Sequence, residues 1–467
     1  MPTNFQPTII DEKAISALLE QQPQKVDIKL VREIFAKALE LKGLSFTEVA
    51  TLLNIEDREL LTEMFQVAKQ VKEDIYGKRL VIFAPLYISN LCTNECSYCA
   101  FRVGNKALKR RALTQQEISE ETKLLIQQGQ KRILLVAGES YTPDSLQYIL
   151  DAIATIYATK SVKGEIRRVN VNIAPLTVED FHKLKAASIG TYQIFQETYH
   201  KDTYKKVHVG GRKTDYYWRL GAVERAIQAG IDDVGIGVLF GLANWRFEVL
   251  AMLQHIAHLN KMFGIGPHTI SIPRIEPASG SVMASAPPNV VSDKDFCKLI
   301  AILRLAVPYT GLILSTRESA VLRREAFALG ISQISAGSRT SPGGYADHVD
   351  EFDASQFALG DHRTLDEIVQ DIVTLGYIPS FCTACYRLGR TGEDFMTLAK
   401  TGKIKNMCSP NALITFQEYL LHYSSSVTKA LGEQLISNEL LSMPERQQQV
   451  LLNLISKLKD GALDVFI

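Results

Sequence analysis

Eight short segments rich in β-branched and aromatic residues recur along the middle of the chain, each followed by a stretch with helical periodicity. They lie near 80–88, 132–137, 167–173, 190–195, 232–239, 268–273, 311–315 and 331–335. In the interval after the first segment, Thr114 and Glu117 form a capping box and Gly129 ends the predicted helix. Eight strands alternating with helices over about 260 residues predict a (β/α)8 barrel of the TIM type.

The segments on either side of the predicted barrel differ from it in pattern. Residues 1–75 show helical periodicity without a β-rich segment, and Ser45 and Glu48 form a second capping box there. We therefore expect an N-terminal helical extension over 1–75 and the barrel over 76–364. Residues 365–467 are again mainly helical, which indicates a C-terminal module.

Six of the seven cysteines form two sets of three: Cys92, Cys96 and Cys99 after the first predicted strand, and Cys382, Cys385 and Cys408 in the C-terminal module. The spacing is Cys-x3-Cys-x2-Cys in the first set and Cys-x2-Cys-x22-Cys in the second. Three thiolates leave one iron of a four-iron cluster free to bind another ligand. Each set can therefore hold an iron-sulfur cluster with an open coordination site.

Zinc binding and burial in the core are the alternative uses of these cysteines. The first set favours iron, because no histidine lies near it and its spacing differs from the paired ligands of zinc sites. For the second set the residues alone decide nothing, because a Cys-x2-Cys pair is common to zinc and redox sites. The seventh cysteine, Cys297, is expected in the core.

Charge and hydropathy exclude several classes of partner. The chain has 52 basic and 51 acidic residues and no long run of one sign, so we expect neither nucleic acid nor an anionic membrane as a partner. Residues 1–13 lack the pattern of a signal peptide, and no apolar run approaches the roughly 18 residues of a membrane helix. A soluble, cytoplasmic enzyme is the expectation.

Catalytic groups of such barrels gather where the strands end. The first cysteine set follows the first strand, and other polar residues end later strands: Glu139, Asn172, Gln196, Glu197, Arg274, Ser315, Arg317, Ser338 and Arg339. His268 instead begins the sixth strand, on the opposite face. There it is either an ordinary buried histidine or an iron ligand that faces the C-terminal module.

The third predicted strand carries two asparagines on one face. Asn170 and Asn172 alternate with apolar residues, so they either line a polar barrel interior or face the outer helices. The first arrangement would provide a passage between the two ends of the barrel.

The first cysteine set, with Tyr98 directly before Cys99, resembles the signature loop of the radical S-adenosylmethionine (SAM) enzymes. In that superfamily a 4Fe-4S cluster binds SAM and reduces it to a 5′-deoxyadenosyl radical. Residues 137–139 resemble the Gly-Gly-Glu segment that receives the methionine amino group, although the first glycine is replaced. The resemblance implies SAM contacts from Tyr98, Gly138 and Glu139, and we expect Arg168 to pair with the opposite charge of SAM.

The resemblance extends to the aromatic amino acid lyases, and is greatest to the tyrosine lyases that mature FeFe hydrogenases. The segments that carry it are 168–176, 192–200, 267–271, 334–340 and 381–387. The second cysteine set resembles the auxiliary-cluster motif of these lyases, which implies a second 4Fe-4S cluster. His268 matches the histidine that helps to hold a fifth iron there, linked through free cysteine.

The resemblance implies cleavage of the Cα–Cβ bond of L-tyrosine to p-cresol and dehydroglycine, and conversion of that fragment to carbon monoxide and cyanide. Arg317 is expected to bind the tyrosine carboxylate with its guanidinium fork. Tyr87 is a candidate for the amine and Ser338 for the carboxylate. The implied partners are L-tyrosine, cysteine and iron, an electron donor such as ferredoxin or flavodoxin, and other hydrogenase maturases.

Two alternatives stay open at this point. A thiazole-forming tyrosine lyase of thiamine biosynthesis would share the lyase chemistry but would hold one cluster. An iron-sulfur scaffold or carrier would hold clusters without radical chemistry and would not cleave SAM.

Overall fold

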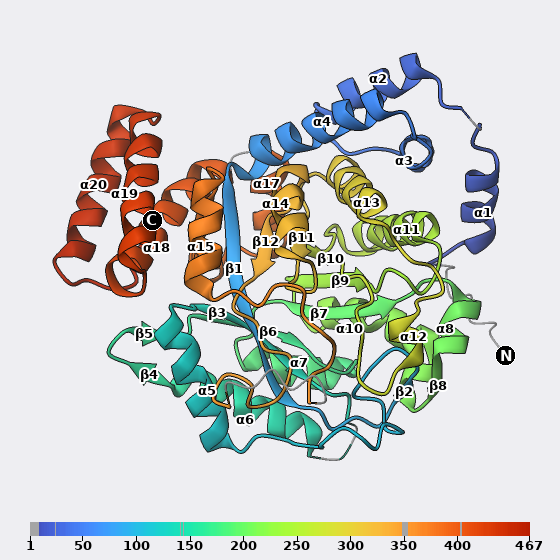
Figure 1. Ribbon diagram of the computed structural model, residues 1–467, viewed down its shortest axis with the longest axis horizontal. Coiled ribbons are helices and arrows are strands. Elements are labelled where there is room, and N and C mark those ends of the chain that lie inside the picture. The colour runs from blue at the N-terminus through green and yellow to red at the C-terminus, as the bar shows by residue number, and fades with distance from the viewer. Residues whose placement is uncertain (1–8, 24, 141, 143, 348–353, 402–403) are drawn as a thin grey trace.

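Eight parallel strands close into a barrel in the computed structural model, which describes residues 9–23, 25–140, 142, 144–347, 354–401 and 404–467 (Figure 1). They are β1 (Arg79–Ser89), β3 (Arg132–Ala137), β6 (Arg168–Asn172), β7 (Tyr192–Glu197), β9 (Val234–Val238), β10 (Thr269–Ser271), β11 (Gly311–Leu314) and β12 (Gln333–Ser335). Neighbours pair in chain order, and β12 pairs with β1 to close the ring. The predicted (β/α)8 barrel is confirmed, and each strand lies within or close to a predicted segment.

Helices surround the barrel and bury its outer face. They are α5 (Gln115–Gln128), α6 (Ser145–Ala158), α7 (Val178–Ala186), α10 (Ala222–Gln228), α11 (Trp245–Phe263), α13 (Asp293–Ala306), α14 (Ala320–Leu329) and α15 (Leu365–Thr374). The predicted capping box begins α5, and Gly129 ends it with a φ of 98°. Cys297 lies buried on α13, as predicted.

The N-terminal extension is helical, as predicted, in α1 (Glu12–Glu20), α2 (Ile28–Ala38), α3 (Phe46–Leu53) and α4 (Arg58–Tyr76). Residues 1–8 of the expected extension lie outside the described part of the chain. The predicted capping box of Ser45 and Glu48 begins α3. The long helix α4 packs against α13 and α14 and therefore fastens the extension to the barrel (Figure 1).

The C-terminal segment contributes one strand that the sequence did not predict. It contains β13 (Ile378–Ser380) followed by α16 (Ala384–Arg387), α17 (Gly392–Lys400), α18 (Lys405–His422), α19 (Ser426–Leu441) and α20 (Glu445–Lys459). Because β1 is 11 residues long, its first residues extend past the neighbouring strands and pair in parallel with β13. This pairing attaches the C-terminal helices beside the start of β1 (Figure 1).

A short antiparallel pair of strands lies at the other end of the barrel, where β2 (Glu95–Cys96) pairs with β8 (His208–Gly210). It fixes the cysteine loop that follows β1 against the segment that follows β7. Among the residues that the structure describes, no helix combines the length and apolar character needed to cross a membrane.

A buried lysine lies where α4 meets the C-terminal segment. Lys72 is 1% exposed, and its ammonium finds no hydrogen-bond acceptor among the described residues. It lies 4.7 Å from the ring centroid of Tyr377, just before β13. Burial is the main reason that the pKa of Lys72 is lowered to about 7, so this amine weakens the fold when it is charged.

Replacement of this lysine by an apolar residue of similar length should stabilise the protein. We predict that Lys72→Met raises the free energy of unfolding by about 4 kcal/mol near neutral pH, because lysine must release part of its proton on folding and methionine has none to release. The gain should disappear above about pH 10.5, where lysine is also neutral in the unfolded chain. Denaturant unfolding at the two pH values, with the exposed Lys69→Met as control, measures this; an equal gain at both would contradict it.

Candidate functional site

A large pocket opens at the carboxyl ends of the barrel strands, as the strand pattern predicts. It encloses about 1400 Å³ of space that protein atoms do not fill, its open mouth included. Cys92, Cys96 and Cys99 line it together with Tyr87 and with the candidate residues Tyr98, Gly138, Glu139 and Arg317. The fold thus brings the first cysteine set and most predicted site residues of this face into one cavity.

The first cysteine set lies on the loop after β1. Asn94 donates its backbone N–H to Cys92 Sγ at 3.5 Å, and the backbone N–H of Cys99 donates to the carbonyl of Cys96 at 3.2 Å. Burial raises the pKa of Cys92 to about 11 and raises the pKa of Cys96 further. The apo thiols are therefore protonated at neutral pH, and a metal cluster would have to displace their protons when it binds.

Gly138 allows the end of β3 to approach this loop. A Cβ atom at this position would lie 2.3 Å from the carbonyl oxygen of Leu91, which no backbone contact allows. The N–H of Gly138 donates to the carbonyl of Ser89, and the N–H of Thr93 donates to the carbonyl of Glu139. The glycine is therefore a steric requirement for the position of the cysteine loop.

Two carboxylates and two cations form a buried network beside the cysteines. Arg219 Nη1 donates to Glu139 Oε1 at 2.8 Å, and Lys213 Nζ donates to Glu197 Oε1 at 2.7 Å. Asn94 Nδ2 donates to the second oxygen of Glu139 at 2.9 Å. Although burial lowers the pKa of Lys213, the two carboxylates hold it above its usual value. Glu139 is thus held in the pocket wall by donors from two other segments of the chain.

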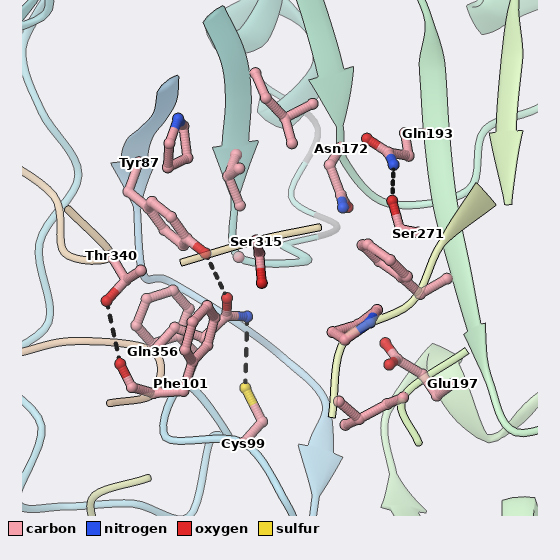
Figure 2. A pocket seen from close by; sticks show the side chains of 18 of the residues that line it. Tyr87, Cys99, Phe101, Asn172, Gln193, Glu197, Ser271, Ser315, Thr340 and Gln356 are labelled. Atoms are coloured by element: carbon pink, nitrogen blue, oxygen red, sulfur yellow. Dashed lines mark hydrogen bonds between the residues drawn. The ribbon is translucent and has the colours of Figure 1, made fainter. Parts of the chain in front are cut away.

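Tyr87 and Cys99 are joined through Gln356, which belongs to the segment after β12 (Figure 2). Tyr87 Oη donates to Gln356 Oε1 at 2.7 Å, and Gln356 Nε2 donates to Cys99 Sγ at 3.8 Å. The pocket wall therefore connects the candidate substrate contact Tyr87 to one of the cluster cysteines.

Arg317 is a buried guanidinium in the wall of the same pocket. Its carbon Cζ lies 3.2 Å from the ring centroid of Phe357, and Nη1 donates weakly to the carbonyl of Arg274 at 3.5 Å. No described carboxylate forms an ion pair with it. Ser338 differs: its hydroxyl is buried without a described partner, and it is not among the residues that line the pocket.

Arg168 does not lie where a SAM contact requires it, and that expectation is wrong. It is the first residue of β6, at the amino ends of the strands, whereas Glu139 follows the carboxyl end of β3. Its guanidinium carbon lies 3.6 Å from the ring centroid of Tyr386, beside the second cysteine set. Arg168 was assigned to SAM by its charge alone, although it begins the strand that Asn172 ends.

The second cysteine set lines a smaller cavity at the opposite mouth of the barrel. Cys382 follows β13, Cys385 lies on α16 and Cys408 on α18. The same cavity is lined by His268, directly before β10, which agrees with the predicted position of this histidine. Burial lowers the pKa of His268, which favours the neutral ring that binds metals.

The cysteine geometry fits clusters better than single ions. Among the described residues no group of three or more His, Cys, Asp or Glu side chains could hold one metal ion. A four-iron cluster does not need three side chains around one metal ion, because each thiolate binds a different iron. Both cavities meet the demand that a cluster does make, which is three cysteines around one buried space.

Only a thin layer of side chains separates the two cavities inside the barrel. On β1, Val81 lines the lower cavity and Phe83 lines the upper one. On β12, Gln333 lines the lower cavity and Ser335 lines the upper one. Asn172 lines the upper cavity, so of the two directions left open by the sequence it takes the inward one (Figure 2). Asn170 lies buried two residues earlier on β6, where its Oδ1 accepts a hydrogen bond from the backbone N–H of Thr191.

Three residues of the pocket escaped the sequence reasoning. Lys213 and Arg219 lie in short helical segments after β8, η1 (Arg212–Thr214) and α9 (Tyr216–Leu220), where no motif marks them. Gln356 lies in an irregular segment far from the cysteines in sequence. Asn94 is a fourth such residue, and its place inside the first cysteine loop could have indicated it.

The comparisons agree with this geometry. Residues 86–254 match the Radical SAM superfamily, and residues 271–378 match the Biotin and Thiamin Synthesis associated domain. The 2-iminoacetate synthase of Salmonella typhimurium is 32% identical over 358 residues, which are 76% of this chain and 92% of that protein.

Two solved structures extend the similarity to the C-terminal segment. A crystal structure of HydG, a maturase of the FeFe-hydrogenase, is 48% identical with a TM-score of 0.95, covering 98% of this chain and 100% of that one. HydG from Carboxydothermus hydrogenoformans is 42% identical with a TM-score of 0.82, covering 95% and 99%.

The steric role of Gly138 can be tested by iron content. We predict that Gly138→Ala, reconstituted anaerobically, retains roughly half of the iron of the unchanged protein, because the added methyl group displaces the first cysteine loop and leaves the second set intact. Gly221→Ala, whose Cβ would first meet the flexible end of Arg225 at 3.1 Å, is the control. Full iron loading of Gly138→Ala would contradict the steric argument.

Proposed function

Since the chain belongs to the HydG family of FeFe-hydrogenase maturases within the radical SAM superfamily, we propose that it cleaves L-tyrosine to p-cresol and dehydroglycine and converts dehydroglycine to carbon monoxide and cyanide. One observation carries the second half of this proposal: a second set of three cysteines, with His268, at the opposite mouth of the barrel. A radical SAM enzyme needs only the first set to bind SAM.

The first site would bind and activate SAM. The superfamily implies a 4Fe-4S cluster and SAM, and together they supply a 5′-deoxyadenosyl radical when bound. Cys92, Cys96 and Cys99 would ligate the cluster, and Glu139 would accept hydrogen bonds from the methionine ammonium. The ring of Tyr98, whose Oη lies 2.8 Å from His208 Nε2, would form a fixed wall beside it.

The tyrosine would lie deeper in the same pocket. Arg317 has the fork geometry that a carboxylate needs and has no described carboxylate as partner, so it is our candidate for the substrate carboxylate. Tyr87 would contact the substrate amine, since its hydroxyl already lies near Cys99 through Gln356. Ser338 is a poorer candidate, because it does not line the pocket.

The second site would receive the fragment. Cys382, Cys385 and Cys408 would hold the auxiliary cluster, and His268 would help to bind the fifth iron with free cysteine as a further ligand. The side chains on the upper side of the layer between the cavities are partly polar, and Gln193 Nε2 donates to Ser271 Oγ there (Figure 2). A short internal route of this kind would let the fragment reach the cluster without entering solvent.

The alternatives have less support. A 32% identical relative is named for making 2-iminoacetate, another name for dehydroglycine, which supports the lyase half of the proposal. A thiazole-forming lyase with one cluster does not account for the second cysteine set. A carrier without radical chemistry does not account for a SAM-type pocket in a radical SAM fold.

The test is product analysis after anaerobic cluster reconstitution with SAM, L-tyrosine and dithionite. We expect p-cresol by chromatography and carbon monoxide by its shift of the reduced haemoglobin spectrum. For the double variant Cys385→Ser/Cys408→Ser we predict that p-cresol persists while carbon monoxide falls sharply, because only the second site is disrupted. Loss of p-cresol in a folded variant that keeps the SAM cluster would contradict this division of roles, and carbon monoxide absent from the unchanged protein would overturn the second half of the proposal.

The role of Arg317 has a separate test. We predict that Arg317→Lys raises the KM for L-tyrosine by about tenfold or more, because an ammonium cannot offer two parallel donors to a carboxylate. SAM cleavage without tyrosine should stay near its original rate. The exposed Arg324→Lys serves as control, and an unchanged KM would exclude the assigned role.

A further inference from the structure

Two basic segments of the chain contain or adjoin the loop of the first cysteine set. Residues 89–112 include five lysines and arginines and one glutamate, and residues 200–213 include five lysines and arginines and one aspartate. With neutral histidines each segment has a net charge of +4, whereas the whole chain has +1. The remaining residues together are therefore net negative, and the positive charge of the protein is concentrated in these two segments.

The first basic segment returns beside the cysteine loop after Cys99. Asn90 donates through Nδ2 to the carbonyl of Lys109 at 2.8 Å, and its backbone N–H donates to the carbonyl of Arg111 at 3.0 Å. Arg110 holds this turn together, because its four hydrogen bonds all go to backbone carbonyls, including that of Asn90 at 2.8 Å. The basic residues of the turn are thus fixed next to the residues that precede Cys92.

The second basic segment lies on another side of the same loop. The strand β8 pairs with β2, and a Cβ atom on Gly211 would lie 2.6 Å from the carbonyl oxygen of Thr93. Lys205 and Lys206 lie at the end of α8 (Lys201–Val207), directly before β8. Thr93 itself is exposed, so the cysteine loop reaches the surface between the two basic segments.

The exposed side chains of both segments combine free charge with apolar area. Four exposed lysines form no ion pair or side-chain hydrogen bond with a described residue: Lys106, Lys109, Lys205 and Lys206. Three exposed apolar residues lie in the same segments: Leu91 is 41% exposed, Val103 is 45% exposed and Val209 is 63% exposed. Apolar side chains within a charged rim are typical of a protein interface, whereas nucleic acid is bound mainly by charge.

An acidic protein with an electron to give is the partner that this surface fits. Each reductive cleavage of SAM consumes one electron, which neither SAM nor tyrosine provides. The net negative charge of the other residues repels an acidic carrier, while the two basic segments attract it toward the cysteine loop. Charge of this kind increases the rate of encounter and selects the orientation in which the partners meet.

We infer that residues 89–112 and 200–213 form the docking surface for a small acidic protein that carries one electron at low potential. The reduced carrier gives one electron to the cluster held by Cys92, Cys96 and Cys99 and is itself oxidised by one electron, without transfer of a proton or a bond. This inference rests on the radical chemistry of the proposed function and adds the surface through which the electron enters.

The test measures binding and compares two reductants. An acidic flavodoxin is the probe, and dithionite is the reductant that needs no docking surface. We expect Lys106→Glu/Lys109→Glu to bind oxidised flavodoxin about tenfold or more weakly at low ionic strength, because attraction becomes repulsion. SAM cleavage by this variant should slow with limiting reduced flavodoxin and stay unchanged with dithionite.

Two further charge reversals locate the surface. Lys205→Glu/Lys206→Glu should weaken flavodoxin binding in the same way. Lys457→Glu/Lys459→Glu, on the exposed side of α20 and far from β2 and β8, should bind as the unchanged protein does (Figure 1). Added salt should weaken binding by the unchanged protein until it approaches that of the first two variants.

Several results would overturn the inference. They are equal affinity for flavodoxin in all three variants, an equal loss of SAM cleavage with both reductants at full iron content, and binding of duplex DNA or anionic vesicles without binding of flavodoxin. If the glutamate variants lose iron, Lys106→Gln/Lys109→Gln is compared instead, and unchanged affinity would again contradict the inference. Failure of the proposed function is distinguishable, because the unchanged protein would then cleave SAM with dithionite without forming p-cresol or carbon monoxide.

Discussion

The strand β1 connects every functional part of this protein. Its carboxyl end leads directly into the loop of the first cysteine set, and its amino end pairs with β13, which leads directly to Cys382. In between, it pairs with β3 and β12 and so completes the barrel. The side chains of Val81, Phe83 and Tyr87 follow one another from the lower cavity to the upper. Hydrogen bonds along one strand thus determine the position of both candidate cluster sites.

The two ends of the barrel provide different electrostatic environments. At the upper end, Glu139 and Glu197 are matched by Arg219 and Lys213, so the network is neutral overall. A neutral, hydrogen-bonded wall suits a ligand such as SAM, which has charged groups of both signs. At the lower end the lining is cationic and lacks carboxylates among the described residues, which suits an anionic cluster and anionic ligands. Each end therefore favours a different class of ligand before any metal is bound.

The sequence predicted those features that depend on local patterns. Apolar segments of strand length, capping boxes and cysteine spacing act over a few residues, so the eight strands, the start of α5 and the loop of Cys92 could be found. His268 could be placed as well, because it directly precedes its strand in the sequence. Lys213, Arg219 and β13 could not be found, since their roles depend on contacts between segments far apart in the chain. Arg168 was misplaced for a simpler reason, since its position at the beginning of β6 puts it at the opposite face.

The pairing of β1 with β13 also determines how material can pass between the two sites. A strand held on both sides within a closed sheet behaves as a rod of fixed length, about 3.3 Å for each residue. The two cysteine sets are attached to opposite ends of this rod, so they cannot swing toward each other as sites on a mobile arm or a hinged domain can. A molecule that passed between them inside the barrel would have to fit between the inward side chains of the strands, so the closed sheet would limit its size.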